Sequence, residues 1–561
     1  MKFINKIVIL FLLIPTMLVV SCDSNFIEIN ENPNGIEPNL ADPNLLMSTV
    51  MTGLATSTTS RGYSGDTGNA AQFTQKDSWS SNRYDWDTGS IWNTNYSLLR
   101  TNKVANEQAV ALGLTFHEGV TLILKSMLLG NLTDYYGDIP YTDALNGNTL
   151  EGEKPAYDTQ ETVYKGIIAD LETASNLLEG TSFENVDADQ DVFYAGDASK
   201  WQKLANSLAL RYYMRLSEKL PAFAQAGVTS MLAKPLISEI DDELALNYIG
   251  GIDSQSWPDH GESSSSEFYR IKPCTTILDK LKDLEDPRIH IWFAPVVTPT
   301  KVVPADQVPG GGDMAEQDGI RYINEATLDA NNYAIYALDT YAANIEAGKT
   351  LIDTSSVYVG LPVAVSNADP YTYNLNTEGS RGGTNAYVSR MNEVFNQKED
   401  GGDLLKSRLF SFAEISFLKA EAAVRGWGSN AETHYLAGIQ ASLEVWGVGD
   451  EYATYITNAE VAFDGSLKMV MQQKWIANMF NGDEAYLDWR RTGFPELKSG
   501  PLAREEVMPL RFIYPSDEIN NNSENNAAGA ASLEGTSYST TDPNDSAYAR
   551  PWIVQGVTTP W

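Results

Sequence analysis

Cysteine is nearly absent from this chain of 561 residues, which contains only Cys22 and Cys274. Two cysteines allow at most one disulfide within the chain, which excludes a small scaffold held together by several disulfides. The fold must therefore be stabilised by a buried apolar core. A chain of this length is enough for two to four ordinary domains or for one large composite domain.

Positive charge is also scarce. The chain has 39 lysines and arginines against 74 aspartates and glutamates, which gives a formal net charge of −35. A surface this acidic repels phosphate backbones and anionic lipid headgroups. We therefore expect neither nucleic acid nor an anionic membrane surface as a partner.

Motifs for catalysis and for cofactors are missing as well. The sequence has no HExxH and no GxSxG motif, and its four histidines lack the spacing of zinc ligands. The segment VPGGGD (308–313) lacks the lysine and the Ser or Thr of a phosphate loop. Carboxylates are too numerous for a pair of them to identify a glycoside hydrolase. We expect no catalytic residues and no cofactor, with a surface glycoside hydrolase or peptidase as the main alternative.

One acidic segment resembles the start of a calcium loop, DADQD at residues 187–191. An EF-hand would place Gly and Glu where this chain has Val192 and Ala198. The sequence therefore predicts no metal site, and only a calcium site of another kind stays open.

The chain has a single strongly apolar run, at residues 7–20, preceded by Lys2 and Lys6. This run is shorter than the roughly 20 residues of a membrane-spanning helix and suits a signal peptide. Val19, Val20 and Ser21 lead directly into Cys22, which resembles the lipobox of bacterial lipoproteins. The resemblance implies cleavage before Cys22 and acylation of this residue, and two or more acyl chains hold a protein stably at a membrane. An ordinary secretory signal is the alternative.

The order of segments along the chain follows from this anchor. Residues 1–21 are the predicted signal peptide, residues 22–44 a tether that becomes a docked coil, and residues 45–561 one composite domain. With Cys22 acylated, Cys274 has no disulfide partner. We expect Cys274 to be a small buried residue, with a nucleophile as the alternative.

Apolar residues recur at helical spacing through much of the domain. Residues 158–179 carry such a stripe, with Asp158 and Glu161 as the predicted capping box. Residues 199–220 repeat the pattern, with Ser199 as the predicted cap.

A further helical pair is predicted in residues 413–446, on either side of a break at 426–428. There Ala431, Tyr435 and Gly438 alternate small and aromatic side chains, which resembles the second helix of a tetratricopeptide repeat. The periodicity by itself predicts a mainly α scaffold of helical hairpins.

Long polar segments separate the helical patterns. Residues 249–271, 295–330 and 347–388 are rich in Gly, Ser, Pro, Asn and Tyr and show little helical period. Loops of this length are functional or disordered in most compact domains. The stretch 520–550 is predicted to be irregular surface coil.

Several segments together resemble the SusD/RagB family of lipoproteins, and their arrangement is most similar to the second SusD-like subfamily. They occur in the expected order and span nearly the whole chain: NENPNG (30–35), LTDYYGDIPYTDAL (132–145), DASKWQKLANSLALRYYMRLS (197–217), DPR (286–288), FAEISFLKAEAAVRGW (412–427), LDWRRTGFP (487–495) and PLRFIYPSDE (509–518).

The resemblance implies a fold and a function. It implies tetratricopeptide-like helical pairs that support a loop-rich half facing the ligand. It further implies a lipid-anchored protein at the surface of an outer membrane, which captures oligosaccharides or other nutrients and delivers them to a SusC-like TonB-dependent transporter without catalysis. A peptide-binding helical-repeat scaffold is the third possibility.

Most residues of these signatures suit structural roles. Gly137 and Pro140 fix a turn after a helix, where Asp138 can accept hydrogen bonds from the backbone. Arg288 of the DPR turn is expected to reach a carboxylate or a carbonyl. Arg490 and Arg491 near Asp488 suggest an ion-paired corner.

Ligand contacts are expected from aromatic residues in polar, aperiodic loops, because a sugar needs a flat ring beside hydrogen-bonding groups. Packing under the loops is the alternative for each of them. Three loops supply the candidates: Trp79, Asn82, Arg83, Tyr84 and Trp86 in the first, Trp257, Tyr269 and Arg270 in the second, and Tyr371 and Tyr373 in the third.

Overall fold

The computed structural model describes residues 41–76, 83–146, 153–180, 182–257, 265–355, 357–364, 373–376, 385–540 and 545–561. The predicted signal peptide, Cys22 and most of the predicted tether lie outside the described residues. In the described part of the chain, no helix combines the length and the apolar character needed to cross a membrane.

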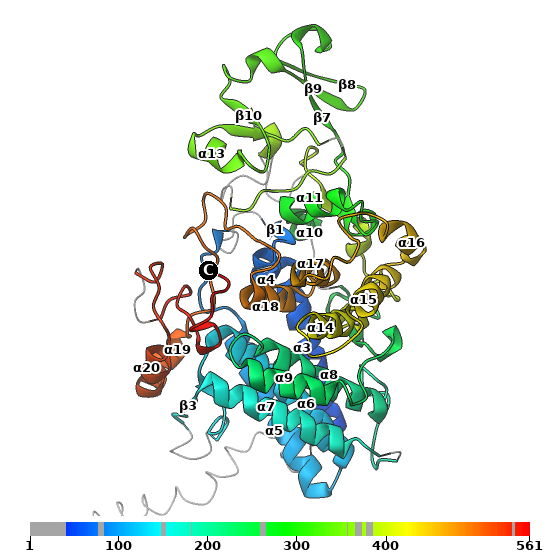
Figure 1. The fold of residues 1–561 in the computed structure, drawn as a ribbon, viewed down its shortest axis with the longest axis vertical. Coiled ribbons are helices and arrows are strands. Elements are labelled where there is room, and N and C mark those ends of the chain that lie inside the picture. Colours follow the sequence, from blue (N-terminus) through cyan, green and yellow to red (C-terminus); the bar gives the residue numbers. More distant parts are fainter. Residues whose placement is uncertain are drawn as a thin grey trace, which may run out of the picture.

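Helices dominate the N-terminal half and stack side by side at one end of the molecule (Figure 1). Among the described residues, α3 packs against α5, α6 against α7, and α8 against α9. This stacking confirms the predicted mainly α scaffold of helix pairs. The bounds are α3 (Pro43–Ser64), α4 (Asp66–Ala70), α5 (Ile91–Leu112), α6 (Thr115–Tyr136), α7 (Gln160–Leu177), α8 (Ala198–Arg215) and α9 (Pro221–Met231).

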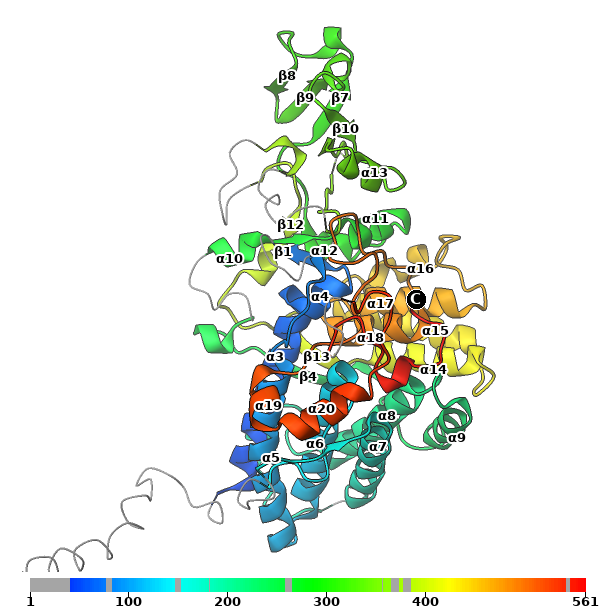
Figure 2. The ribbon, with the colours of Figure 1, turned by 90° about the vertical axis from the view of Figure 1, so that its left-hand side faces the viewer.

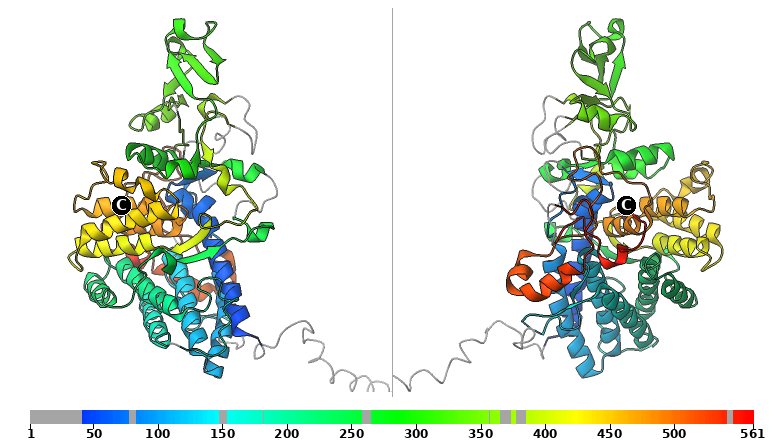
Figure 3. Two further views of the ribbon diagram at one scale, coloured as in Figure 1. Left: turned by 90° about the vertical axis from the view of Figure 1, so that its right-hand side faces the viewer. Right: turned by 60° about the vertical axis from the view of Figure 1, so that its left-hand side comes forward.

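A second helical group continues the stack in the middle of the molecule (Figures 1 and 3). Here α14 pairs with α15 and also contacts α8 and α17, while α18 contacts α3 and α4. The two groups therefore form one body. The bounds are α14 (Phe412–Val424), α15 (Ala431–Val445), α16 (Tyr452–Tyr455), α17 (Leu467–Ala477) and α18 (Gly482–Thr492).

The close approach of α14 and α15 depends on a glycine, Gly438. A Cβ atom on Gly438 of α15 would lie 2.8 Å from ring atoms of Phe417 on α14. The small–aromatic alternation predicted for this helix is thus confirmed at Gly438, where only hydrogen fits between the helices.

Two predicted helix caps are wrong by one or two residues. α7 is capped by Thr159, whose side chain accepts from Thr162 N, while Asp158 accepts from Thr142 N of the preceding segment at 2.8 Å. α8 is capped by Asp197, which accepts from Ser199 N at 2.9 Å, so Ser199 lies inside the helix. In both helices a neighbouring polar side chain, that of Thr159 or of Asp197, accepts from the free backbone amides of the first turn.

A lobe of short strands projects from the opposite end of the molecule (Figures 1 and 2). β9 lies between β7 and β8, parallel to the first and antiparallel to the second, and β10 pairs with β11 in parallel. The segments 295–330 and 347–388 therefore contain strands, which sequence analysis did not predict. The bounds are β7 (Thr300–Val303), β8 (Met314–Gln317), β9 (Ile320–Asn324), β10 (Tyr333–Ile335), α13 (Tyr341–Glu346) and β11 (Thr350–Ile352).

Short elements connect the lobe to the body or lie over the body. They comprise β1 (Thr74–Lys76), which pairs with β5 (Ile271–Pro273), β2 (Ile139–Pro140) with β3 (Tyr157–Asp158), β4 (Leu244–Asn247) with β13 (Lys406–Phe410), and β6 (Phe293–Ala294) with β12 (Arg390–Met391). The helices are α10 (Ser265–Arg270), α11 (Thr275–Asp283), α12 (Ile289–Trp292), α19 (Ser516–Asn521) and α20 (Ser523–Ala531).

The prediction of coil for residues 520–550 is wrong in its first part, because α20 forms there. Alanine favours helix, and Gly529 of α20 packs closely on the ring of Tyr157. Tertiary contact and helix propensity together order a segment that carries no apolar stripe.

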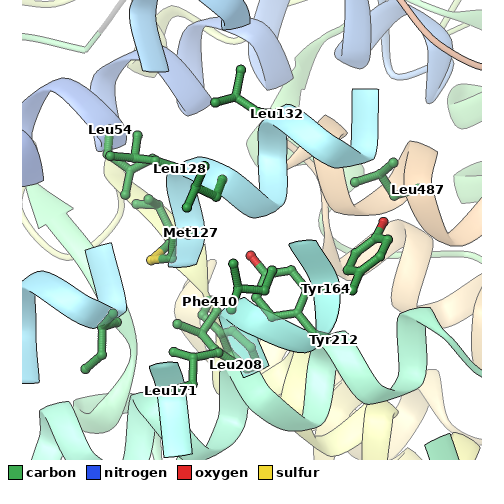
Figure 4. Packing of buried hydrophobic residues seen from close by; sticks show 14 of the residues in the cluster. Leu54, Met127, Leu128, Leu132, Tyr164, Leu171, Leu208, Tyr212, Phe410 and Leu487 are labelled. Atoms are coloured by element: carbon green, nitrogen blue, oxygen red, sulfur yellow. The ribbon is translucent and has the colours of Figure 1, made fainter. Parts of the chain in front are cut away.

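The main core joins residues from helices far apart in the sequence. Figure 4 shows side chains from α3, α6, α7, α8, β13 and α18 packed together, including Leu54, Leu128, Leu208 and Leu487. Each of these four leucines is 0 or 1% exposed. A second buried cluster lies under α11, α14, α15 and α17 and contains Trp257, Trp292 and Trp475.

Candidate functional site

A cavity of about 260 Å³ lies between the lobe and the body. Helix α11 and helix α17 form its body side, and the segment between β10 and α13 forms its lobe side. The turn 495–498 closes one edge. The cavity therefore lies between α11 and α17 on one side and the β10–α13 segment on the other. These elements are labelled in Figure 1.

Aromatic residues form much of its wall. Tyr336 is half-buried, and its ring centre lies 6.0 Å from that of the buried Tyr341. Trp475 is only 3% exposed, because its ring packs in the second buried cluster, and its Nε1 donates to Ala71 O at 2.8 Å. Leu338 is 64% exposed. Tyr336 is thus the ring most available to a ligand.

Burial raises the pKa of Tyr336 and of Tyr341 above the usual value for tyrosine, with nearby Cys274 as a further cause for both. Both phenols are therefore neutral near pH 7. A neutral phenol both donates and accepts a hydrogen bond, which suits a hydroxyl group of a ligand.

Polar groups at the floor of the cavity are held by a hydrogen-bonded chain. Gln72, 1% exposed, accepts from Thr276 Oγ1 at 2.7 Å and donates to Lys498 O at 2.6 Å. The same amide nitrogen lies 3.1 Å from Tyr84 OH. Thr275 Oγ1 is buried and has no hydrogen-bond partner among the described residues. The floor therefore offers the hydroxyl group of the half-buried Thr276, which Gln72 holds in place, whereas Thr275 Oγ1 is covered by protein.

Three of the six charged residues that line the cavity, Asp279, Lys468 and Glu496, are in ion pairs. Lys282 bonds Asp279 at 2.7 Å, and Lys468 bonds Glu496 at 3.0 Å. Partial burial raises the pKa of Asp283. The remaining lysines that line the cavity are Lys280 and Lys498. With three acidic and three basic residues in its lining, the cavity has no net formal charge.

The first predicted loop lies partly inside the protein. Tyr84 is fully buried behind Gln72, and Trp86 is 3% exposed and stacks on Phe512 at 4.5 Å. The expectation of exposed rings is therefore wrong for these two residues, because the loop folds back onto the core. Arg83 is half-buried and donates to Leu502 O at 2.6 Å. Trp79 and Asn82 lie outside the described residues.

The second predicted loop also has both buried and half-buried candidate residues. Trp257 is 2% exposed among Tyr63, Tyr248 and other rings, and Arg270 is 4% exposed, so neither offers a surface to a sugar. Here too the expectation of exposure is wrong, since the loop covers an apolar cluster. Tyr269 is half-buried, and its hydroxyl donates to Glu393 Oε1 at 3.2 Å. Tyr269 does not line the cavity.

In the third loop, Tyr373 is 5% exposed and packs in the small core of the lobe, so the expected exposure is wrong there as well. Tyr371 lies outside the described residues. Sequence analysis missed Tyr336 and Tyr341, which fall between the polar segments 295–330 and 347–388. Their signal was the recurrence of tyrosine in NNYAIYALDTY (331–341).

The structural roles predicted for the signature residues are confirmed at two turns. Asp138 accepts from Gln160 N at 2.8 Å, just after the turn at Gly137. Arg288 is fully buried and donates to Asp286 at 2.8 Å and to Ser442 at 2.6 Å.

The predicted corner at residues 488–491 is also ion-paired. Arg491 bonds Asp488 at 2.9 Å, whereas Arg490 donates to the carbonyl oxygens of Asp134 and Leu510. Arg490 thus ties α18 to the end of α6 through backbone groups rather than through Asp488.

The remaining candidates for chemistry also have structural roles. Cys274 is fully buried, and burial raises the pKa of its thiol to about 11, so it packs as predicted. Asp191 accepts from Trp201 Nε1 at 2.7 Å and from Gly196 N at 2.9 Å. In the described ranges, no group of three or more metal-ligating side chains is placed to hold an ion.

Comparison with solved structures shows the same fold. A SusD homologue from Bacteroides fragilis superposes with a TM-score of 0.65 at 20% identity, covering 91% of this chain and 99% of the other. A chitin-binding protein gives 0.67 at 23% identity, with 91% and 99% covered. A SusD homologue from Bacteroides ovatus gives 0.66 at 19% identity, with the same coverage. No curated protein sequence matches the chain.

The solved SusD homologues therefore share this chain's fold of stacked helix pairs. A SusD-like family, described as "Starch-binding associating with outer membrane", matches residues 33–359 and 355–515. The chain belongs to this family. The resemblance read from the sequence is thus confirmed, and the family's description supports association with the outer membrane.

Proposed function

We propose that this protein is a surface lipoprotein that captures oligosaccharides in the cavity between lobe and body and passes them to a SusC-like TonB-dependent transporter. The observation that supports this proposal is the cavity itself, with Tyr336 in its wall and the hydroxyl group of Thr276 at its floor. Membership of a family described as starch-binding supports a carbohydrate ligand. Cys22 is the proposed site of the lipid anchor.

The physical argument starts from the shape of a sugar. A pyranose ring has an apolar C–H face, which packs on an aromatic ring, and hydroxyl groups around its edge, which need partners. Tyr336 supplies the ring, and Thr276 on α11 supplies a hydroxyl group to the same cavity. Thr276 lies in the first turn of helix α11, where the helical backbone fixes its position, so its hydroxyl group needs little ordering on binding.

We propose binding without cleavage. Glycoside hydrolysis needs two carboxyl groups at a defined separation, one of them free to accept or donate a proton. Asp279 and Glu496 are ion-paired with lysines. Their pairing disfavours a role as acid or base and supports a structural one.

The direct test is Tyr336→Ala with Tyr333→Ala as the matched control, since Tyr333 lies three residues away in β10 and does not line the cavity. The probes are malto-oligosaccharides and chito-oligosaccharides, titrated by calorimetry. We expect Tyr336→Ala to weaken binding at least tenfold, about 1.4 kcal/mol, and Tyr333→Ala to leave it unchanged. Equal affinities for both variants would contradict the site, and cleavage products would contradict the binding role.

The anchor and the partner have separate tests. Cys22→Ser is expected to move the protein from the membrane fraction to the soluble fraction, because the thiol that carries the lipid is lost. Purification of the wild-type protein from outer membranes is expected to retain a TonB-dependent barrel. A Cys22→Ser protein that stays with membranes would contradict the anchor.

A further inference from the structure

A larger hollow lies on the other face of α11. One cavity of about 770 Å³ adjoins another of about 290 Å³, and Glu285, Pro287 and Glu451 line both. The two form one groove. Small-molecule sites have volumes of roughly 300–1,000 Å³, so the groove has the size of a ligand site.

Helix α11 separates this groove from the lobe cavity. Thr276, Asp279 and Asp283 line the lobe cavity, whereas Leu281 lines the groove. At about 100° per residue, Leu281 points away from the other three. The groove is therefore a separate hollow and not an extension of the first.

Apolar side chains form one part of the wall. Pro287 and Ile291 come from the DPR turn and from α12, and Val357 and Val448 come from the facing segments. Val357 is 47% exposed. This part of the groove wall is an apolar surface formed by aliphatic side chains and a proline rather than by an aromatic ring.

Hydrogen-bonding groups stand beside this apolar wall. His290 is exposed, and its Nδ1 lies 2.7 Å from Tyr358 OH, which leaves Nε2 directed at no described partner. The carboxylates of Glu285 and Glu451 make no ion pair or hydrogen bond with the described residues. Ser355 adds a hydroxyl group, which accepts from Lys282 Nζ at 3.5 Å. Lys282 also lines the groove, and its charge is paired with that of Asp279. The groove thus combines acceptors with groups that both donate and accept.

This combination identifies the class of ligand. An anion would be repelled by two unpaired carboxylates, and a purely apolar ligand would remove water from them without replacing its hydrogen bonds. A polyhydroxylated ligand offers hydroxyl donors to the carboxylates and C–H groups to Pro287 and Val357. The geometry points to a second carbohydrate site in this groove, so that each chain holds sugar at two places. The ligand class rests on the proposed function.

The test uses variants outside α11, so that the lobe cavity keeps its wall. Glu451→Ala combined with His290→Ala removes a carboxylate and an imidazole from the groove. Asp450→Ala is the matched control, because Asp450 is the exposed neighbour of Glu451 and lines neither hollow. Circular dichroism and the unfolding midpoint establish that all variants fold.

Calorimetric titration with malto-oligosaccharides and chito-oligosaccharides is expected to show two binding events per wild-type chain. The Glu451→Ala/His290→Ala variant should lose one event or weaken it at least tenfold, while Asp450→Ala keeps both. Tyr336→Ala should remove the other event. A single wild-type event that the groove variant leaves unchanged would overturn the second site.

Two further outcomes separate the two proposals. If the groove variant abolishes one event and Tyr336→Ala has no effect, the groove stands and the lobe cavity fails as a site. If only amine-bearing ligands bind in the groove, and neutral oligosaccharides do not, the carbohydrate assignment is overturned.

Discussion

The helical body and the loop-rich half use charged residues in opposite ways. In the body, Arg211 bonds Glu414 at 2.7 Å and Arg215 bonds Glu484 at 2.7 Å, with all four side chains at most 8% exposed. Around the two hollows, charged groups are exposed: Lys468 and Glu496 are 58% and 70% exposed. Charged residues thus join helices in one region and face solvent in the other.

Buried and exposed ion pairs contribute differently to the free energy of unfolding. A buried charge must be paired, because removing it from water costs several kcal/mol, whereas an exposed pair contributes about 0–1 kcal/mol. Substitutions in the body should therefore change stability, and substitutions at the hollows should change binding. The predictions below test this division, beginning with the largest effect.

Glu421→Ala should destabilise the protein by about 3–5 kcal/mol, because it removes a buried carboxylate that pairs with two arginines. Arg491 would keep only Asp488 as an ion-pair partner, and Arg425 would keep only Glu218. Glu421 is fully buried and bonds Arg491 and Arg425 at 2.8 Å. Although burial disfavours its charge, these arginines hold the pKa of Glu421 below its usual value. Urea unfolding measures the change.

The control for that experiment is Glu107→Ala, which removes the exposed partner of Lys103. Its expected effect is within about 0.5 kcal/mol. Equal effects of the two substitutions would contradict the distinction between buried and exposed pairs.

Gly438→Leu should destabilise the protein by about 1–3 kcal/mol, because the new side chain meets the ring of Phe417 and forces α14 and α15 apart. Gly535→Leu is the control, since a Cβ at Gly535 meets nothing within 4 Å. Thermal unfolding of both variants measures the difference. A Gly438→Leu protein as stable as the control would show that the helix pair is not closely packed.

Acid should remove part of the body's stability. Despite burial, Lys474 and Arg491 hold the pKa of Asp488 well below its usual value. A carboxylate with a lowered pKa in the folded state stabilises above its unfolded pKa of about 4, and this stabilisation is lost as the pH falls further. The gap between wild type and Asp488→Asn, about 1–3 kcal/mol at pH 7, should shrink below pH 4. A gap that stays constant down to pH 3 would argue against this ion pair.

Tyr269→Ala should have the smallest effect, a loss of less than about 1 kcal/mol. Its ring is half-buried, its hydroxyl bonds the exposed Glu393, and Arg390 lies 5.4 Å from the ring centre. Because Tyr269 lines neither hollow, oligosaccharide affinity should not change. A loss of affinity equal to that of Tyr336→Ala would move the site toward β12 and α10.

The helical body was largely predictable from sequence. Stripes such as Val163, Ile167 and Leu171 repeat at helical spacing, and all three side chains are fully buried. The caps were less certain, because Asp197 and Ser199 compete for the same amides. The lobe was not predictable, since strands of three to five residues such as β10 and β9 pair only after distant segments meet.

The candidate site was only partly predictable. Aromatic residues in polar loops were the correct kind of residue, but composition does not tell which rings fold inward. Trp86 and Trp257 pack against aromatic rings in the core, whereas Tyr336 is only half-buried. Tyr84 supports the cavity through Gln72 without touching its interior surface. The cavity beside α11 is formed by residues far apart in the sequence, so it could be found only in the structure.

The most direct measurement is a crystal structure of the protein soaked with a malto-oligosaccharide or a chito-oligosaccharide. The account predicts a sugar ring packed on Tyr336, with a hydroxyl group within hydrogen-bonding distance of Thr276. Sugar bound only along the faces of the helix pairs, with both hollows beside α11 empty, would contradict it.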